Sequence, residues 1–513
     1  FPMHTDSERD LLAKEWLHRR GSWLGWLQPL RRRSLTKHPA AVAKPSLMDY
    51  FGERLSLYFA FLGFHARWLF ILGLIGAAVQ GVVEYTRNRQ QKIVGLYAVC
   101  CSLWSILFCK SWKLRQSRLA MEWGMSDFEA LEQVRPAFAK KFPKRVKSYI
   151  TGEVDYYEQP AAAQRKHAFV SKSISMLTIC FILAINVFLY WLKWWLNHSS
   201  WLKGEVPSIA TYAATIHSVL LSLTISVVNK LYVSLSEFLV EYENPRTETE
   251  YRDRKISKVF LVQFISSYAS LTYTAFAAQN IEGGCGEVAC FDSLTKMVFI
   301  ILVERLLFTL LFDEILPKLK VKGKHFQETR GVDEHVKTDL GQPEKEYLLD
   351  QYDQGQETLN RFMDQVLMFG YVVLFVVAFP LGPFLGYASN VFQIQWFGDF
   401  LLNEKQRNIP VGVQDIGSFQ GCFEAVAGIA VISNSALIFF TMKDAIFGDT
   451  ISLFEVIWAF FGTQAIIFSL YAAVEYSIPN TSETVVIQLK RRRYLEEKLF
   501  TFEGKSRLMV EVE

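Results

Sequence analysis

The stretch TYAATIHSVLLSLTISVVN, residues 211–229, carries no Asp, Glu, Lys or Arg and is mostly apolar. A helix needs about 20 such residues to cross the hydrocarbon core of a bilayer. Its polar residues recur every three or four positions, and at about 100° per residue such positions share one face of a helix. We therefore predict a membrane-spanning helix over residues 207–235 that is apolar on most of its surface and polar along one side.

Comparable stretches along the chain predict an all-α integral membrane protein with ten transmembrane helices. The predicted spans are residues 65–86, 93–112, 173–196, 207–235, 258–279, 292–316, 362–385, 387–403, 415–441 and 451–477. With 51% hydrophobic and 15% aromatic residues, the 513-residue chain is too apolar for a soluble protein. Several of its seven cysteines lie inside apolar runs, which excludes a disulfide scaffold as the organising principle.

Basic residues predict the orientation of the chain. Lys and Arg concentrate after the second, fourth and tenth spans, and the positive-inside rule places these segments and both termini in the cytosol. We expect cytosolic pre-membrane helices over residues 1–64, a ten-helix domain over 65–479 with a charged cytosolic loop at 317–357, and a cytosolic segment at 480–513. The glycosylation sequon at Asn197 would then lie outside. The host membrane would be the plasma membrane or an endomembrane such as the endoplasmic reticulum.

Hydroxyl and amide side chains form a polar seam on the fourth and fifth predicted helices. The seam consists of Thr211, Thr215, Ser218, Ser222, Ser226, Asn229, Gln263, Ser266, Ser270 and Thr274. Such residues also mediate ordinary packing between membrane helices, and that interpretation stays open. The length of the seam favours a hydrated groove, because packing needs only two or three small residues. Arg305 adds a charge on the sixth helix, where ionisable residues are costly enough to indicate function.

Short motifs throughout the chain carry a family resemblance. They are YFGERLSLYFAFLG at 50–63, ENPRTETEY at 243–251, GGC at 283–285 with Cys290, FGY at 369–371 and FPL at 379–381. In this order they resemble the anoctamins, a family of calcium-activated lipid scramblases and chloride channels. The resemblance implies a homodimer with one lipid-facing groove per subunit. It also implies an external cysteine loop, in which Cys285 and Cys290 are disulfide candidates.

The resemblance implies a calcium site as well, and here the sequence departs from the family pattern. The family uses five carboxylates and often an Asn from its sixth, seventh and eighth helices. The matching positions in this chain are Thr309, Asp313, Arg361, Asp364, Gln393 and Phe397. Two of these are acids, whereas calcium gains affinity from the charge and number of its oxygen ligands. Thr309, Asp313, Asp364 and Gln393 would therefore form a weak site at best, and calcium is a cofactor by resemblance alone.

Arg361 stands where the family has an acid. One hypothesis is that its guanidinium neutralises Asp364 or Asp313 in place of calcium, with Arg305 in support, so that activity does not need calcium. The alternative is that Arg361 lies at the cytosolic end of its helix and extends into water.

The predicted function is phospholipid scrambling through a polar groove that faces the membrane. The seam offers hydroxyls and amides and no basic ring that would select anions. Two alternatives stay open: an anion or non-selective ion channel of the same fold, which Arg305 favours, and a membrane tether or scaffold without transport. The chain lacks the glycine loop, His pair and triad spacing of common enzymes, so we expect no enzyme. The expected partners are membrane phospholipids and a second copy of the chain, with no nucleic acid.

Overall fold

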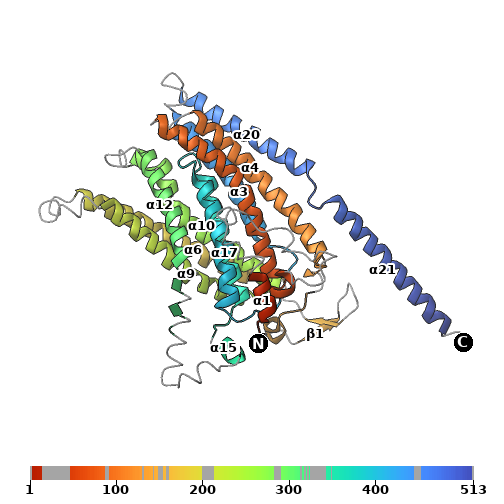
Figure 1. Cartoon of the computed structure of the whole chain (residues 1–513). Coiled ribbons are helices and arrows are strands. Elements are labelled where there is room, and N and C mark those ends of the chain that lie inside the picture. Colours follow the sequence, from red (N-terminus) through yellow and green to blue (C-terminus); the bar gives the residue numbers. More distant parts are fainter. Residues whose placement is uncertain are drawn as a thin grey trace.

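The computed structural model describes most of the chain as long helices (Figure 1). The described residues are 3–13, 47–86, 92–126, 128–129, 132–141, 144–147, 154–156, 161–198, 213–281, 290–311, 315–316, 319–320, 323, 342–347, 349–443 and 452–510. In chain order the helices are α1 Asp6–Leu12, α2 Leu47–Phe51, α3 Glu53–Thr86, α4 Lys92–Glu122, α5 Pro136–Lys141, α6 Ala161–His198, α9 Ala213–Glu243, α10 Glu248–Phe276, α11 Ala278–Ile281, α12 Cys290–Leu310, α15 Gln342–Tyr347, α16 Gln354–Leu374, α17 Gly382–Asn403, α18 Phe419–Ala436, the π-helical turn η7 Leu437–Thr441, α20 Leu453–Ser477 and α21 Glu483–Val510. Strands β1 Arg145–Lys147 and β2 Val154–Tyr156 pair antiparallel, a hairpin that the sequence analysis had not predicted.

Seven helices in the described part are long and apolar enough to cross a membrane. They are Glu53–Thr86, Lys92–Glu122, Ala162–Leu196, Leu223–Glu243, Glu248–Phe276, Phe419–Thr441 and Leu453–Ser477. Each overlaps one of the predicted spans. Helices α12, α16 and α17 occupy the places of the sixth, seventh and eighth predicted spans but fall outside this criterion. The all-α membrane architecture thus agrees with the prediction, whereas the number of ten spans stays a prediction.

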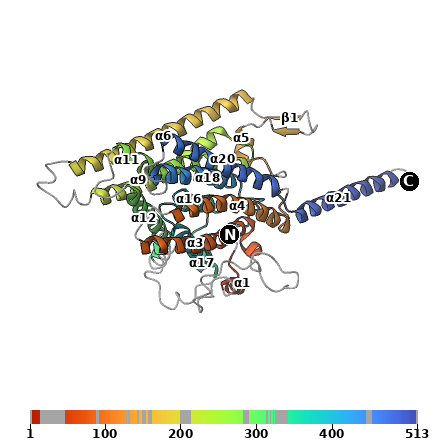
Figure 2. The ribbon, with the colours of Figure 1, turned by 90° about the horizontal axis from the view of Figure 1, so that it is seen from above.

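The helices form two packed groups. Helix α3 lies along α17, and α18 lies against both α4 and α16; α6, α9 and α10 pack on one another (Figures 1 and 2). Aromatic rings fill the first group, with the ring of Phe369 5.5 Å from that of Phe108 and 5.3 Å from that of Phe423. Helix α20 instead exposes large apolar side chains such as Trp458, as expected where lipid is the solvent. Helix α21 extends away from the bundle in both views.

Two long helices begin within segments that the sequence predicts to lie outside the membrane spans. Helix α3 begins at Glu53, inside the segment 1–64 that was expected to precede the membrane. Helix α16 begins at Gln354, so the end of the predicted loop 317–357 is already helical. Asp353 explains that start, because its carboxylate accepts hydrogen bonds from the backbone N–H groups of the first turn at 3.0 and 3.2 Å.

The predicted seventh span, 362–385, is wrong at its end, since α16 stops at Leu374 and a turn precedes α17. Pro380 lies in this turn and cannot donate a helical hydrogen bond. The turn packs closely on α3, where a Cβ added to Gly76 would collide with the carbonyl oxygen of Pro380. Tyr97 of α4 bridges the two, because its hydroxyl lies 3.0 Å from the carbonyl oxygen of Leu72 on α3 and 3.4 Å from that of Pro380.

Candidate transport groove

Tyr190 of α6 closes the α10 half of the polar seam. Its hydroxyl lies 2.7 Å from Oγ of Ser270 and 3.1 Å from Oγ1 of Thr274, and it donates to the carbonyl of Ser270 at 3.1 Å. Ser270 and Thr274 are 2% and 5% exposed, and Gln263 and Ser266 are buried as well. In this conformation the α10 seam is therefore occupied by helix contacts.

A second tyrosine joins α6 to α9. The hydroxyl of Tyr232 donates to Oγ of Ser175 at 2.8 Å, and its buried ring packs with Ile179, Ile182 and Val262. The polar spacing in the sequence did not predict either tyrosine as a member of the site. A signal was present, since a tyrosine inside an apolar run needs a hydrogen-bond partner when it is buried.

The α9 half of the seam lies on the flank of its helix. Thr211 is outside the described residues, and for positions 215, 218, 222 and 226 the structure describes the helical backbone. Successive residues of a helix are rotated by about 100° around its axis. By this measure the four positions lie roughly 90° around the axis from the buried Leu221 and Tyr232. They lie roughly 120° from Leu223 and Val227, which are exposed on the other side. Asn229 on this flank is half-buried, and its Oδ1 has no hydrogen-bond partner within the described part of the chain.

His217 links α9 to the tyrosine that closes α10. Its ring is 6% exposed and its centroid lies 4.6 Å from that of Tyr190. Tyr190 thus contacts both helices that carry the seam. The prediction that the seam lines a hydrated groove stays a prediction, and the structure describes its α10 side in a closed arrangement.

Arg305 of α12 binds Asp364 of α16. Their Nη1 and Oδ1 atoms are 3.4 Å apart, and the guanidinium lies 5.1 Å from the ring centroid of Tyr371. The side chain of Arg305 is 23% exposed and that of Asp364 62%. Arg305 therefore offsets the charge of Asp364, whereas the hypothesis from the sequence gives it a supporting role.

Three further positions of the expected calcium site, Arg361, Gln393 and Phe397, make other contacts. The guanidinium of Arg361 lies 3.6 Å from the ring centroid of Phe397, a stacking contact between a cation and an aromatic face. Oε1 of Gln393 accepts hydrogen bonds from Nε2 of Gln365 at 2.6 Å and from the hydroxyl of Tyr58 at 3.3 Å. The oxygen that would bind calcium is therefore already used inside the protein.

The described residues of this region do not fit a calcium ion. Asp313 and the side chain of Thr309 lie outside them, and the described residues contain no cluster of three or more His, Cys, Asp or Glu that could hold a metal. Cys285 also lies outside, and Cys290 is described only as the first residue of α12. Asn197 lies in the last turn of α6. The disulfide and the glycan stay predictions.

These features define an all-α, multi-spanning membrane protein whose apolar helices carry a polar seam. The family model "Anoctamin: Calcium-activated chloride channel" matches residues 47–492, so the chain belongs to the anoctamin family. This confirms the family resemblance, and membership in a family of channels and scramblases agrees with the prediction that the chain is not an enzyme.

The relatives are similar over most of this chain. Human (Homo sapiens) Anoctamin-7 is 25% identical over 456 residues, which cover 76% of this chain and 48% of the relative. Anoctamin-5 of Mus musculus is 24% identical over 470 residues, 77% of this chain and 51% of the relative. Anoctamin-4 of Bos taurus is 25% identical over 460 residues, 76% and 49% respectively. The chain thus spans about half the length of these curated relatives.

Proposed function

We propose that this protein is a phospholipid scramblase whose headgroup path follows the polar flank of α9 and the seam of α10. The observation that carries the proposal is the place of Tyr190, which holds Ser270 and Thr274 while it contacts His217. If α6 separated from α10, the hydroxyl groups of Ser270 and Thr274 would become exposed beside the polar flank of α9. The side chain of Leu223, on the same helix as this flank, is already exposed. Hydrogen bonds of this kind contribute about 0.5–1.5 kcal/mol each, so the hydroxyl of Tyr190 makes a modest contribution to the closed arrangement.

Scrambling is favoured over an anion channel by the environment of Arg305. An anion-selective pore needs basic side chains whose charge is available to the permeating ion. The charge of Arg305 is offset by Asp364, and its guanidinium faces the ring of Tyr371. The channel and the transport-inactive tether are therefore the alternatives that an experiment should separate.

The proposed activity does not require calcium. The ion pair between Arg305 and Asp364 and the stacking of Arg361 on Phe397 place protein cations where the family resemblance predicts calcium. Any contribution of Asp313 adds one carboxylate to that of Asp364, which is too little charge for a tight site. The proposal includes a homodimer in which each subunit has its own groove, and cytosolic termini.

Reconstituted liposomes with fluorescent phospholipids test the function. The purified protein should speed the loss of outer-leaflet fluorescence after chemical quenching, equally with calcium and with a chelator. Anion flux without lipid exchange would identify the channel, and the absence of both would identify the tether. A steep calcium dependence of scrambling would contradict the calcium-independent proposal.

A further inference from the structure

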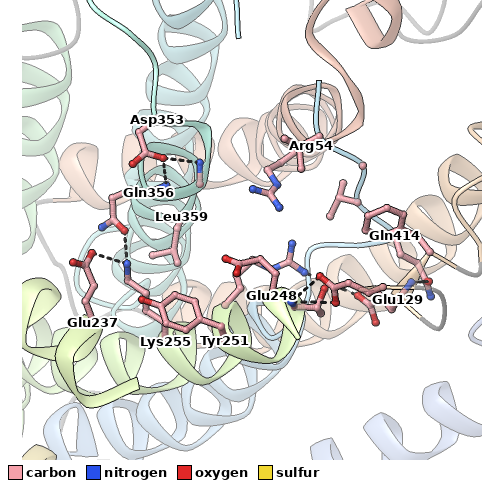
Figure 3. A pocket seen from close by; sticks show the side chains of 18 residues that line it. Arg54, Glu129, Glu237, Glu248, Tyr251, Lys255, Asp353, Gln356, Leu359 and Gln414 are labelled. Carbon is pink, nitrogen blue, oxygen red and sulfur yellow. Dashed lines mark hydrogen bonds and ion pairs between the residues drawn. The ribbon is translucent and has the colours of Figure 1, made fainter. Parts of the chain in front are cut away.

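A cavity of about 360 Å³ lies where α3, α10 and α16 begin, separate from the polar seam (Figure 3). The end of α9, the segment 411–414 and the residues Phe128, Glu129 and Glu132 complete its walls. The volume lies within the usual range of small-ligand sites, about 300–1,000 Å³.

Close backbone contacts fix the walls of this cavity. A Cβ added to Gly412 would lie 2.7 Å from the ring of Phe128, so the 411–414 segment approaches its neighbour as only glycine allows. The N–H of Arg54 donates to the carbonyl of Val411 at 3.3 Å. Gly417 follows with φ +61°, and the next N–H donates to Asp253 at 3.0 Å. The cavity is thus a built feature of the fold.

Two of its carboxylates serve as caps for helix beginnings. Glu132 accepts the N–H of Thr249 in the first turn of α10, at 3.1 and 3.2 Å. Asp353 accepts the N–H groups of Gly355 and Gln356 at the start of α16. The positive ends of the two helix dipoles offset these charges.

Two further carboxylates are held by cations. Glu237 binds Nζ of Lys255 at 2.7 Å, and Glu248 binds Nε of Arg135 at 3.0 Å. Arg135 is shared, because it also binds Glu241 at 2.7 Å. Most of the carboxylates in the cavity walls are therefore already paired with a cation or with the start of a helix.

Arg54 and Arg252 add positive charge to the cavity and are not paired as closely as Lys255 and Arg135 are. Figure 3 shows the guanidinium of Arg54 directed into the open centre of the cavity. Nε of Arg54, and Nε and Nη2 of Arg252, are buried without a hydrogen-bond partner within the described residues. Glu129 lies 4.0 Å from Nη2 of Arg252, at the limit of an ion pair. Glu132, Glu248 and Asp353 lie close enough to Arg54 to act on its charge, but none of them accepts a hydrogen bond from its Nε.

We propose that this cavity binds a phosphate group between Arg54 and Arg252. The planar fork of an arginine matches the oxygens of a phosphate, and buried N–H donors without partners favour such an anion. A free phosphomonoester and the headgroup of a phosphomonoester lipid share this chemistry. The bound group would join the first turn of α3 to that of α10, the helix that carries Ser270.

Binding to the purified full-length chain tests the proposal without any transport assay. Equilibrium dialysis with radiolabelled glycerol 3-phosphate probes the free ligand. Nanodiscs with phosphatidic acid, compared with pure phosphatidylcholine, probe the lipid through the thermal unfolding midpoint. Saturable binding of either ligand supports the proposal. Competition by glycerol 3-phosphate in nanodiscs would identify the phosphate alone as sufficient, and a response to phosphatidic acid only would identify the lipid headgroup.

Matched variants assign the site to the two arginines. Arg54→Gln and Arg252→Gln should each weaken binding at least about tenfold, and Arg252→Lys, which keeps the charge, should lie between them and the wild type. Arg254→Gln is the control, because Arg254 binds Glu243 and Glu250 and does not line the cavity. Its affinity should stay within about twofold of the wild type. Absence of saturable binding to the wild type in both formats, or equal weakening by Arg254→Gln, would overturn the proposal.

Discussion

Nζ of Lys110 on α4 lies 2.6 Å from Oε1 of Glu475 on α20. The two partners differ in solvent access, since Lys110 is 4% exposed and the side chain of Glu475 44%. The ammonium also donates to Oδ1 of Asn480 at 2.7 Å. Glu475 lies two residues before the end of α20 and is half-exposed there, whereas the buried Lys110 depends on its protein partners.

This asymmetry predicts unequal effects on stability. Glu475→Gln leaves a buried ammonium without its counter-charge and should lower the free energy of unfolding by about 1–3 kcal/mol. Lys110→Met should cost less than about 1 kcal/mol, because an apolar chain replaces the buried charge. Denaturant or thermal unfolding in detergent measures both, with Glu496→Gln in the exposed pair to Arg492 as the control. Equal losses for Lys110→Met and Glu475→Gln would contradict the argument.

Tyr190→Phe should increase the rate of scrambling. The variant keeps the ring but removes the hydroxyl that contacts Ser270 and Thr274. A loss of about 1 kcal/mol from the closed state corresponds to a rate increase of roughly fivefold. Tyr85→Phe is the control, because Tyr85 is 91% exposed at the end of α3. An unchanged or lower rate for Tyr190→Phe would argue that the tyrosine does not close the path.

Acidic substitutions should create calcium dependence. In Arg361→Glu/Gln393→Glu, two new carboxylates join Asp364 near the place where the family resemblance predicts calcium. Saturating calcium should stabilise this double variant by about 1–3 kcal/mol, as a ligand that binds only the folded state does. The wild type should show no calcium-dependent shift of its unfolding midpoint. Addition of Asp364→Asn should reverse the gain, and a calcium response of the wild type would contradict the prediction.

Glycosylation tests the orientation of the chain. Asn197 should carry a glycan when the protein is expressed in a eukaryotic cell, so Asn197→Gln should increase gel mobility as glycosidase treatment does. Asn480 belongs to a second sequon but accepts a hydrogen bond from Lys110, and Asn480→Gln should leave the mobility unchanged. A glycan on Asn480 would reverse the predicted topology.

Acid should loosen the N-terminal segment. His4 lies in a buried site, where Nδ1 is 2.5 Å from the hydroxyl of Tyr50 and Nε2 is 2.9 Å from the carbonyl of Lys405. Burial lowers the pKa of His4 below its ordinary value of 6.5, and the nearby charge of Glu346 opposes this shift in part.

The sign of the pH effect follows from this lowered pKa. As pH falls below about 6.5, a released His4 binds a proton more readily than the docked one, so docking weakens. Protease cleavage near residues 3–13 should therefore become faster at pH 5.5 than at about pH 7.5, by roughly two- to tenfold. His4→Gln should remove the pH dependence, and an unchanged cleavage rate for the wild type would contradict it.

Much of the architecture was predictable because a helix surrounded by lipid needs a long apolar segment, which can be recognised in the local sequence. A long apolar segment such as 211–229 is stable only inside a bilayer. The spacing of its polar residues places them on one face of a helix, and this can be read without any tertiary contact. The order of the motifs from Tyr50 to Pro380 was also sufficient to identify the family. The end of α16 was predicted less well, because hydropathy continues through the turn that holds Pro380.

The sequence by itself determined the membrane class, the family, the polar face of α9 and the departure at Arg361, since these depend on residue type and spacing along one chain. Only the tertiary structure decided that Arg305 binds Asp364, 59 positions away, and that Tyr190 closes on Ser270, 80 positions away. Such partners are set by how helices rotate and pack against each other, and hydrophobic periodicity leaves that rotation open where several faces of a helix are apolar.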